Sequence, residues 1–291
     1  MKKLVHALHL TLVVASFTLF VASCHKGDED FGKRRVTPIS REEGSGTRDA
    51  FVELFDIRQD SSASQSLDMI SDEADVTNSS EVMLSAVAGG KGAVGYVSLG
   101  ALSGAVKAIR IDGVYPSVAN IKKGSYKMSR PFNVVTRQDA QEAAADFIRY
   151  ILSSDGQAVV EKAGYIAFAS NPRYVATGKR GKVSVVGSSS VAPLMQKLAR
   201  EYQRLSPDVN VEVHLSDSTT GIRSVISGLC DIGMMSRGLT ASERDQGVRQ
   251  TTIATDGIVV IVNKANPIDE LTSESVRRLF SGEAGTWGEV L

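Results

Sequence analysis

The sequence predicts an α/β protein of about two domains, and three observations support this. The chain has 291 residues, a length typical of two domains. From Val36 onward, short apolar stretches that suit strands alternate with amphipathic stretches that suit helices, which is the pattern of an α/β fold. Apolar residues make up 42% of the chain and charged residues 23%, the profile of an ordinary globular protein.

Helices are assigned where apolar residues recur every three or four positions, and strands where they alternate or run continuously. In the first half we expect strands at Ala93–Ser98 and Ala108–Ile111, and helices at Arg48–Phe55, Asp139–Ser153 and Gly156–Lys162. After a basic linker at Ala176–Lys182 we expect strands at Val183–Val186, Val209–Leu215, Leu229–Met235 and Ile253–Val262, and helices at Ala192–Leu205, Gly221–Gly228 and Ser273–Phe280.

The N-terminus has the pattern of an export signal. Two lysines precede the apolar run Leu4–Val21, and small residues stand directly before Cys24. This pattern predicts a lipoprotein signal peptide over residues 1–23, with lipid attached to Cys24. The alternative is a membrane-spanning helix with an incidental cysteine, but the run is barely long enough to span. The polar residues 24–35 are expected to be a flexible tether.

Composition excludes several classes of function. Lys plus Arg equals Asp plus Glu at 33 each, so no long-range field would recruit nucleic acid. Two cysteines and four scattered histidines show no metal-ligand spacing, so neither metal nor cofactor is expected. Cys230, the other cysteine, lies in an apolar stretch and is expected to be a buried, inert thiol.

Three Gly/Ser/Thr-rich segments each precede a predicted helix and are candidate anion sites. They are Gly44–Thr47 with Arg41 just upstream, Gly187–Ser190, and Ser216–Gly221, and Ser236 follows a further strand. Backbone amides at a helix start bind anions well. Each segment alone is also explained as ordinary helix capping. Three such segments and one arginine together could surround a tetrahedral oxyanion.

At these segments the chain resembles the phosphate-binding proteins of bacterial ABC phosphate transporters, which have the type II periplasmic binding protein fold. The matching motifs are Arg41–Arg48, Gly92–Val97, Tyr126–Phe132, Val185–Pro193, Ser216–Gly221, Asp231–Arg237, Asp256–Asn263 and Leu271–Trp287. Together they cover nearly all of residues 36–291.

The resemblance implies two lobes, each a mixed sheet flanked by helices, joined by a two-segment hinge that closes over inorganic phosphate. The implied phosphate-binding residues are Arg41, Ser45, Gly46, Thr47, Ser189, Ser190, Ser218 and Ser236. It also implies a monomer that is exported, is anchored to the cell envelope by lipid, and delivers phosphate to an ABC permease.

The order of the two halves differs from the family's usual order. The Gly-Ser-Gly-Thr loop comes first here and the Gly-Ser-Ser-Ser loop second, so the chain resembles a circularly permuted member. One lobe is expected at 36–100 plus 262–291 and the other at 104–256, with crossings near 99–105 and 256–263. A truncated or rearranged gene product is the alternative.

The ligand and the class of protein have their own alternatives. Where family members place an aspartate that accepts the phosphate proton, this chain has Ser236. Asp217, Asp256, Glu42 or Glu43 are possible substitutes, and another tetrahedral oxyanion is a possible ligand. A further hypothesis is a surface lipoprotein that senses phosphate. A serine hydrolase is disfavoured, because no Gly-x-Ser-x-Gly motif and no histidine near a candidate serine occur.

Overall fold

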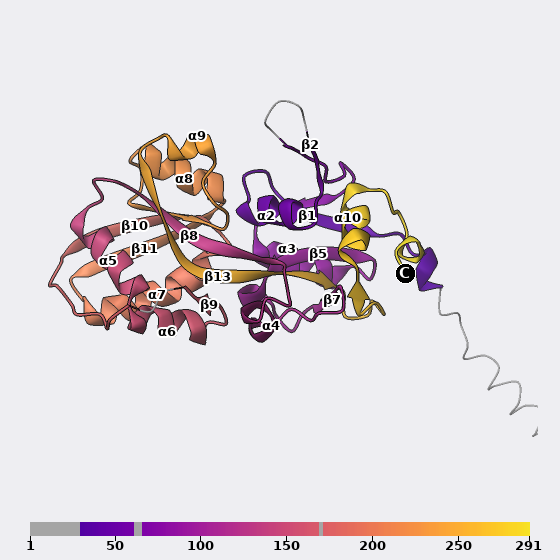
Figure 1. Cartoon of the computed structure of the whole chain (residues 1–291), viewed down its shortest axis with the longest axis horizontal. Coiled ribbons are helices and arrows are strands. Elements are labelled where there is room, and N and C mark those ends of the chain that lie inside the picture. Colours follow the sequence, from indigo (N-terminus) through magenta and orange to yellow (C-terminus); the bar gives the residue numbers. More distant parts are fainter. Residues whose placement is uncertain (1–29, 61–65, 169–170) are drawn as a thin grey trace, which may run out of the picture.

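The computed structural model describes residues 30–60, 66–168 and 171–291. They form two α/β lobes side by side, joined by the long strands β8 and β13 (Figure 1). The predicted two-lobed α/β architecture is therefore confirmed. The predicted signal peptide and Cys24 lie outside the described residues. Within the described part, no helix is both long and apolar enough to span a membrane.

The first lobe is built around strands β5, β1 and β4, which follow the C-terminal part of β13 in the sheet. Its elements are η1 (Phe31–Lys33), β1 (Thr37–Arg41), α2 (Gly46–Leu54), β2 (Arg58–Asp60), β3 (Ser66–Asp68), β4 (Asp75–Thr77), α3 (Ser80–Gly89), β5 (Ala93–Ser98), η2 (Leu99–Ala101), β6 (Lys107–Ala108), β7 (Arg110–Ile111), α4 (Val118–Lys122), β14 (Glu270–Leu271), α10 (Ser273–Ser281) and η3 (Trp287–Glu289).

The second lobe is built around the strand order β11-β10-β12-β8-β13. Its elements are β8 (Ser129–Arg137), α5 (Glu142–Leu152), α6 (Ser154–Lys162), β9 (Ile166–Ala167), β10 (Gly181–Ser188), α7 (Ala192–Leu205), β11 (Val209–Ser216), α8 (Ser218–Ile226), β12 (Ile232–Met235), α9 (Ala241–Arg244) and β13 (Val248–Val262). Strand β10 pairs in parallel with both β11 and β12, so the residues after these strands lie along one sheet edge.

The hinge strands correct one predicted boundary. Strand β13 runs between the two cores, with Ile253 packed in the second and Ile258 in the first. Residues 104–128 were assigned to the second lobe, but Ile109 and Tyr126 pack in the core of the first. The reason is that β6 pairs with the first-lobe part of β13, and β7 pairs with β14. The first crossing is therefore at the start of β8, and not near 99–105.

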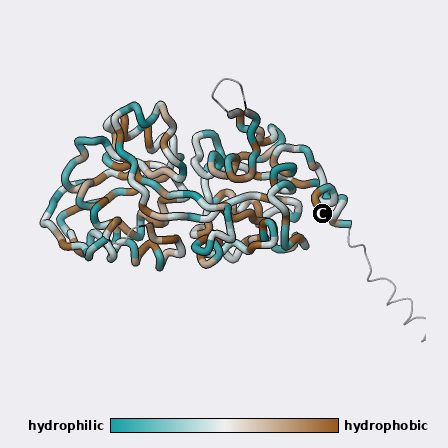
Figure 2. The backbone as a smooth tube through the Cα atoms, viewed as in Figure 1, coloured by the Kyte–Doolittle hydropathy of each residue, from teal (hydrophilic) through white to brown (hydrophobic). Residues whose placement is uncertain are grey.

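Most predicted elements are found within a few residues of their expected ends. Helix α8 starts three residues earlier than expected because Asp217 caps it by accepting the amide of Thr220. Strand β12 begins at Ile232 and not at Leu229, which is 79% exposed. The predicted strand Ala108–Ile111 is two short strands, β6 and β7. Hydrophobic stretches run through both lobes (brown in Figure 2), as expected for two packed cores.

The two ends of the described chain meet on the first lobe. The Phe31 ring lies 5.8 Å from that of Trp287, and the Val36 amide donates to the carbonyl of Gly285 at 2.9 Å. Residues 30–35 therefore pack on the lobe, and the prediction of a flexible tether through residue 35 is wrong for them.

Candidate anion site between the lobes

The starts of helices α2, α7 and α8 meet between the two lobes. Their hydroxyl side chains are almost completely buried, with exposed fractions of 0–2% for Ser45, Thr47, Ser189, Ser190, Ser218 and Ser236. Each helix start carries unpaired amides and a positive dipole end. The structure thus brings the predicted site residues of both lobes to one place, including Arg41, which is 2% exposed.

Hydrogen bonds cross directly from one lobe to the other at this place. The hydroxyls of Thr47 and Ser190 are 2.7 Å apart. The amide and the hydroxyl of Thr219 donate to the carbonyl of Gly44 at 3.2 and 3.3 Å. Arg41 donates to the Ser189 hydroxyl at 3.1 Å. These contacts hold the two lobes in a closed arrangement.

Arg41 is held in place by Glu42 and Tyr96. Its guanidinium forms a bidentate ion pair with the Glu42 carboxylate, and both N–O distances are 2.7 Å. Its backbone amide donates to the Tyr96 hydroxyl at 3.1 Å, and that hydroxyl lies 2.8 Å from the hydroxyl of Ser40. Burial raises the pKa of Tyr96 to about 12, so its hydroxyl stays neutral. A charge-paired arginine in fixed orientation suits an oxyanion.

A chain of hydroxyls lies on the second-lobe side. The Ser188 hydroxyl donates to Ser236 Oγ at 3.1 Å, and the Ser236 amide donates to Ser218 Oγ at 3.1 Å. Hydroxyl oxygens can both donate and accept. Ser236 therefore lies inside this network.

Gly46 lies where the two lobes are in close contact. A Cβ atom at this position would be 2.4 Å from Ser218 Oγ and 2.9 Å from Ser236 Oγ. A larger side chain fits there only if the two serine hydroxyls move out of their present positions. The glycine therefore allows the first-lobe helix start to reach the serines of the second lobe.

Sequence reasoning missed Arg130, which lies on strand β8 beneath the site. It is 4% exposed and donates to the carbonyls of Gly46 and Ser236 at 3.2 and 3.5 Å. Asp256, on the neighbouring strand β13, accepts from Arg130 at 3.2 and 3.3 Å and from the Ser98 hydroxyl at 2.8 Å. The sequence does contain a signal, because Arg130 and Asp256 are charged residues that lie in strands within two of the motifs that resemble the family.

Burial shifts the pKa values of Asp256 and Arg130 in opposite directions. It raises the pKa of the Asp256 carboxyl, an effect that the charge of Arg130 opposes. It lowers the pKa of the Arg130 guanidinium, an effect that Asp256 opposes. Each group thus favours the charged form of the other, as expected for a buried ion pair.

The four carboxylates predicted as possible acceptors of a phosphate proton occupy different places. Asp217 accepts the amide and hydroxyl of Thr220 at 2.8 and 2.6 Å. Glu42 is paired with Arg41 and Asp256 with Arg130, while Glu43 is exposed. Each of the first three carboxylates therefore already has a hydrogen-bond donor.

A cluster of ion pairs links the two lobes at the edge of the site. Arg237 of the second lobe is 2.9 Å from the Asp49 carboxylate of the first, and two of its nitrogens are 2.8 Å from Glu243. Burial raises the pKa of Asp49, an effect opposed by Arg237. This cluster is a further contact between lobes, more exposed than those of the site.

The described part of the chain offers few residues suited to bind a metal ion or to activate a nucleophile. No group of three His, Cys, Asp or Glu that could hold a metal ion occurs there. His214, the one histidine in residues 30–60, 66–168 and 171–291, has a 61% exposed side chain 3.7 Å from Glu212. Cys230 is 7% exposed, and burial raises the pKa of its thiol to about 11, which matches the expected inert thiol.

Comparisons with known proteins place the chain in a family. A family profile described as "PBP superfamily domain" matches residues 26–155 and 174–290. The chain is 48% identical over 271 residues to "Phosphate-binding protein PstS 2" of Streptococcus agalactiae, covering 93% of this chain and 92% of that protein. The crystal structure of a phosphate ABC transporter phosphate-binding protein from Streptococcus pneumoniae is 39% identical, with a TM-score of 0.70, covering 89% of this chain and 100% of that one.

The match to "Phosphate-binding protein PstS" of Pseudomonas aeruginosa is 35% over 130 residues and covers only 40% of either chain. A match over less than half of each chain is what a permuted order would produce in a continuous alignment. The nearly full-length match to the Streptococcus agalactiae protein means that the two share one order of segments. The chain belongs to the PBP superfamily and, within it, to the family of the PstS phosphate-binding proteins.

Proposed function

We propose that this protein captures inorganic phosphate between its two lobes and delivers it to the permease of an ABC importer. One observation carries the proposal. The starts of three helices, drawn from both lobes, and one paired arginine converge on a buried place made almost entirely of hydroxyl and amide donors. Relatives that are 39–48% identical are named for phosphate binding, which supports the same ligand here.

The proposed binding residues divide between the lobes. Arg41, Ser45, Gly46 and Thr47 would donate from the first lobe, and Ser189, Ser190, Ser218 and Ser236 from the second. In the closed arrangement these groups bond to one another across the cleft. On binding, phosphate oxygens would take over these donors, so the anion itself would link the lobes. Neutral donors and helix dipoles would stabilise its charge.

Arg130 and Asp256 would act as a positioning pair. Arg130 sits on the hinge and bonds one carbonyl from each anion loop, Gly46 and Ser236. An open cleft would separate those two carbonyls, so Arg130 could bond both only when the lobes are closed. Asp256 compensates the charge of Arg130 at a site where an unpaired charge would be strongly unfavourable.

Selectivity would come from the hydroxyls that accept as well as donate. Ser236 Oγ already accepts one hydrogen bond, and a hydroxyl oxygen can accept the proton of a phosphate P–OH group. Without a dedicated carboxylate, repulsion of fully ionised sulfate would be weaker than in members with an aspartate. The second candidate function is therefore capture of another tetrahedral oxyanion.

Titration calorimetry with phosphate, arsenate and sulfate would test this function. Phosphate and arsenate should bind with similar affinity and sulfate more weakly. Small-angle scattering on the same samples should show a smaller radius of gyration after phosphate is added. Equal affinity for sulfate would refute phosphate selectivity, and an unchanged radius with phosphate bound would refute closure.

We also propose where in the cell the protein acts. Export and a lipid anchor at Cys24 would place a monomeric domain on the outer side of a membrane, where it could meet the permease. Mass spectrometry of the mature protein should find Cys24 at the N-terminus with lipid attached. A mature protein without lipid on Cys24 would rule out the anchor. A strain that lacks the protein but takes up phosphate normally would instead favour the sensing lipoprotein.

The hydrolase reading finds no support at the site. Candidate nucleophiles such as Ser45 and Ser190 are surrounded by hydroxyls and an arginine, and His214 lies on β11 with an exposed side chain. A serine nucleophile needs an adjacent base.

A further inference from the structure

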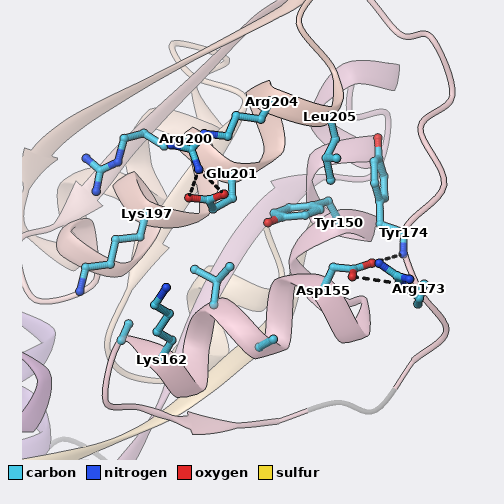
Figure 3. Close-up of a pocket in the computed structure, with 13 residues that line it drawn as sticks. Tyr150, Asp155, Lys162, Arg173, Tyr174, Lys197, Arg200, Glu201, Arg204 and Leu205 are labelled. Atoms are coloured by element: carbon cyan, nitrogen blue, oxygen red, sulfur yellow. Dashed lines mark hydrogen bonds and ion pairs between the residues drawn. The ribbon is translucent and has the colours of Figure 1, made fainter.

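A cavity of about 710 Å³ lies between helices α6 and α7 of the second lobe. Figure 3 shows its lining side chains, which come from both helices and from the segment around Tyr174. None of the proposed phosphate-binding residues lines it. We call this feature the α6–α7 groove, and define its charged lining as Asp155, Lys162, Arg173, Lys197, Arg200, Glu201 and Arg204.

The two helices form the groove walls through regular spacing. Helix α6 contributes Asp155, Val159 and Lys162, and helix α7 contributes Lys197, Arg200 and Arg204. Positions separated by three, four or seven residues lie on one helix face. Lys197 and Arg204 are thus about 10 Å apart along the α7 axis. The groove is long enough for a small organic molecule, and its volume is in the range of such sites.

The groove has an excess of positive charge that the rest of the chain lacks. Its lining holds five cations and two carboxylates, although the full chain has 33 of each. Arg173 pairs with Asp155 at 3.3 Å and Arg204 with Glu201 at 2.8 Å. Among the described residues, Lys162, Lys197 and Arg200 have no carboxylate partner within salt-bridge distance, since the two carboxylates of the lining pair with Arg173 and Arg204. Figure 3 shows these three cations at one end of the groove.

The hydroxyl of Tyr150 is a second, independent feature of the groove. Tyr150 is 1% exposed, and in the described part of the chain its hydroxyl has no hydrogen-bond partner. Two neighbouring tyrosines differ, because Tyr174 and Tyr202 both donate to Asp146, at 2.6 and 2.8 Å. Burial raises the pKa of Tyr150 to about 12, so its hydroxyl keeps its proton. In Figure 3 it points into the groove, where it can donate to a ligand.

We propose that the α6–α7 groove binds an organic phosphate, a molecule with a multiply charged phosphate head and an apolar or ring-shaped body. The head would lie at Lys162, Lys197 and Arg200, where three cations lack partners. The body would lie over the apolar lining of Val159 and Ala163 and reach the Tyr150 hydroxyl. Orthophosphate is too small for both features, and a single exposed ion contact is weak.

Binding of a nucleoside triphosphate would test this proposal, measured by calorimetry in saturating orthophosphate so that the site between the lobes is occupied. The wild-type protein should bind one molecule per chain. The double variant Lys197→Glu/Arg200→Glu should bind at least tenfold more weakly, because it reverses two of the three unpaired cations. Its affinity for orthophosphate should not change.

The matched control is Lys123→Glu/Lys127→Glu, which reverses two exposed cations of the first lobe. It makes the same change in net charge and should bind the nucleotide as the wild type does. An equal loss in this control would show nonspecific charge attraction and overturn the proposal. Tyr150→Phe should weaken binding about threefold, and no change would overturn the role of the hydroxyl.

Inorganic tripolyphosphate distinguishes the head from the body of the ligand. It should bind more weakly than the nucleotide, because it has no body to contact Val159 and Ala163. Equal affinity would overturn recognition of an organic phosphate and leave a site for phosphate chains alone. No heat with either probe would overturn the site.

Discussion

The site between the lobes and the α6–α7 groove both gather groups that attract anions, but they do so in opposite ways. Between the lobes, Arg41 and Arg130 are 2% and 4% exposed, and each is paired with a carboxylate. In the groove, Lys162, Lys197 and Arg200 are exposed and have no carboxylate partner among the described residues. The first arrangement depends on donor geometry and the second on net charge.

This difference has consequences for selectivity and for salt. Buried donors with fixed positions discriminate between anions by shape and protonation, because a wrong ligand leaves donors unsatisfied. Exposed cations attract any anion of sufficient charge, and salt screens them. The two regions can therefore be separated by mutations and by ionic strength.

Gly46→Ala should have the largest effect. The added Cβ would meet Ser218 Oγ at 2.4 Å, so the lobes could not close and phosphate binding should be lost in calorimetry. Binding to the α6–α7 groove should not change.

The matched control is Gly104→Ala, where an added Cβ has no atom within 4 Å. It should bind phosphate like the wild type. Normal phosphate binding by Gly46→Ala would contradict the closed geometry of the site.

Asp256→Asn should have the next largest effect, on stability. It leaves the buried guanidinium of Arg130 without its counter-charge, which costs about 3–5 kcal/mol when one member of a buried pair is removed. Urea unfolding would measure the loss. The double variant Arg130→Met/Asp256→Asn should recover much of it but bind phosphate more weakly, since the bonds to Gly46 and Ser236 are missing. Full phosphate affinity in the double variant would contradict a positioning role.

Arg41→Met should weaken phosphate binding by about 10- to 100-fold, since charged hydrogen bonds contribute about 1.5–3 kcal/mol. It also leaves Glu42 unpaired, so Arg41→Met/Glu42→Gln is the better test of the charge itself. If calorimetry shows that the double variant binds as tightly as the wild type, Arg41 does not contact the ligand.

Salt should separate the two regions further. An increase from 0.05 to 0.5 M NaCl should weaken nucleotide binding in the groove about tenfold, because its cations are exposed. If calorimetry shows the same nucleotide affinity at both salt concentrations, the exposed cations of the groove do not bind the nucleotide.

Asp49→Asn should have the smallest effect. Its pair with Arg237 crosses the rim at 2.9 Å but is partly exposed, with 44% of the Asp49 side chain accessible. Such pairs contribute about 0.2–1 kcal/mol, so phosphate affinity should fall at most about fivefold. A larger loss in a phosphate titration would show that the rim, and not the buried site, controls closure.

Local patterns explain why much of the fold was predictable. Helix α7 has the predicted ends Ala192–Leu205 and strand β5 the predicted ends Ala93–Ser98. The anion loops were recognisable because small hydroxyl residues cluster before helices. These are short-range signals, so they survive without knowledge of tertiary contacts.

Long-range contacts explain what the sequence did not reveal. Arg130 and Asp256 are 126 residues apart and meet because β8 and β13 pair. The boundary at 104 was wrong because β6 pairs with distant β13. The groove combines helices α6 and α7 with Tyr174, and the free hydroxyl of Tyr150 depends on which tyrosines reach Asp146. None of these pairings leaves a local pattern.

The proposed capture of phosphate depends on a buried, charge-paired site between the lobes. Calorimetric titration of the wild-type protein with phosphate in 0.05 and 0.5 M NaCl tests this dependence. We expect one phosphate per chain, with an affinity that changes less than about twofold between the two salt concentrations, because closed lobes shield the site from screening. No binding heat, or a loss of affinity as steep as that expected for the groove, would contradict it.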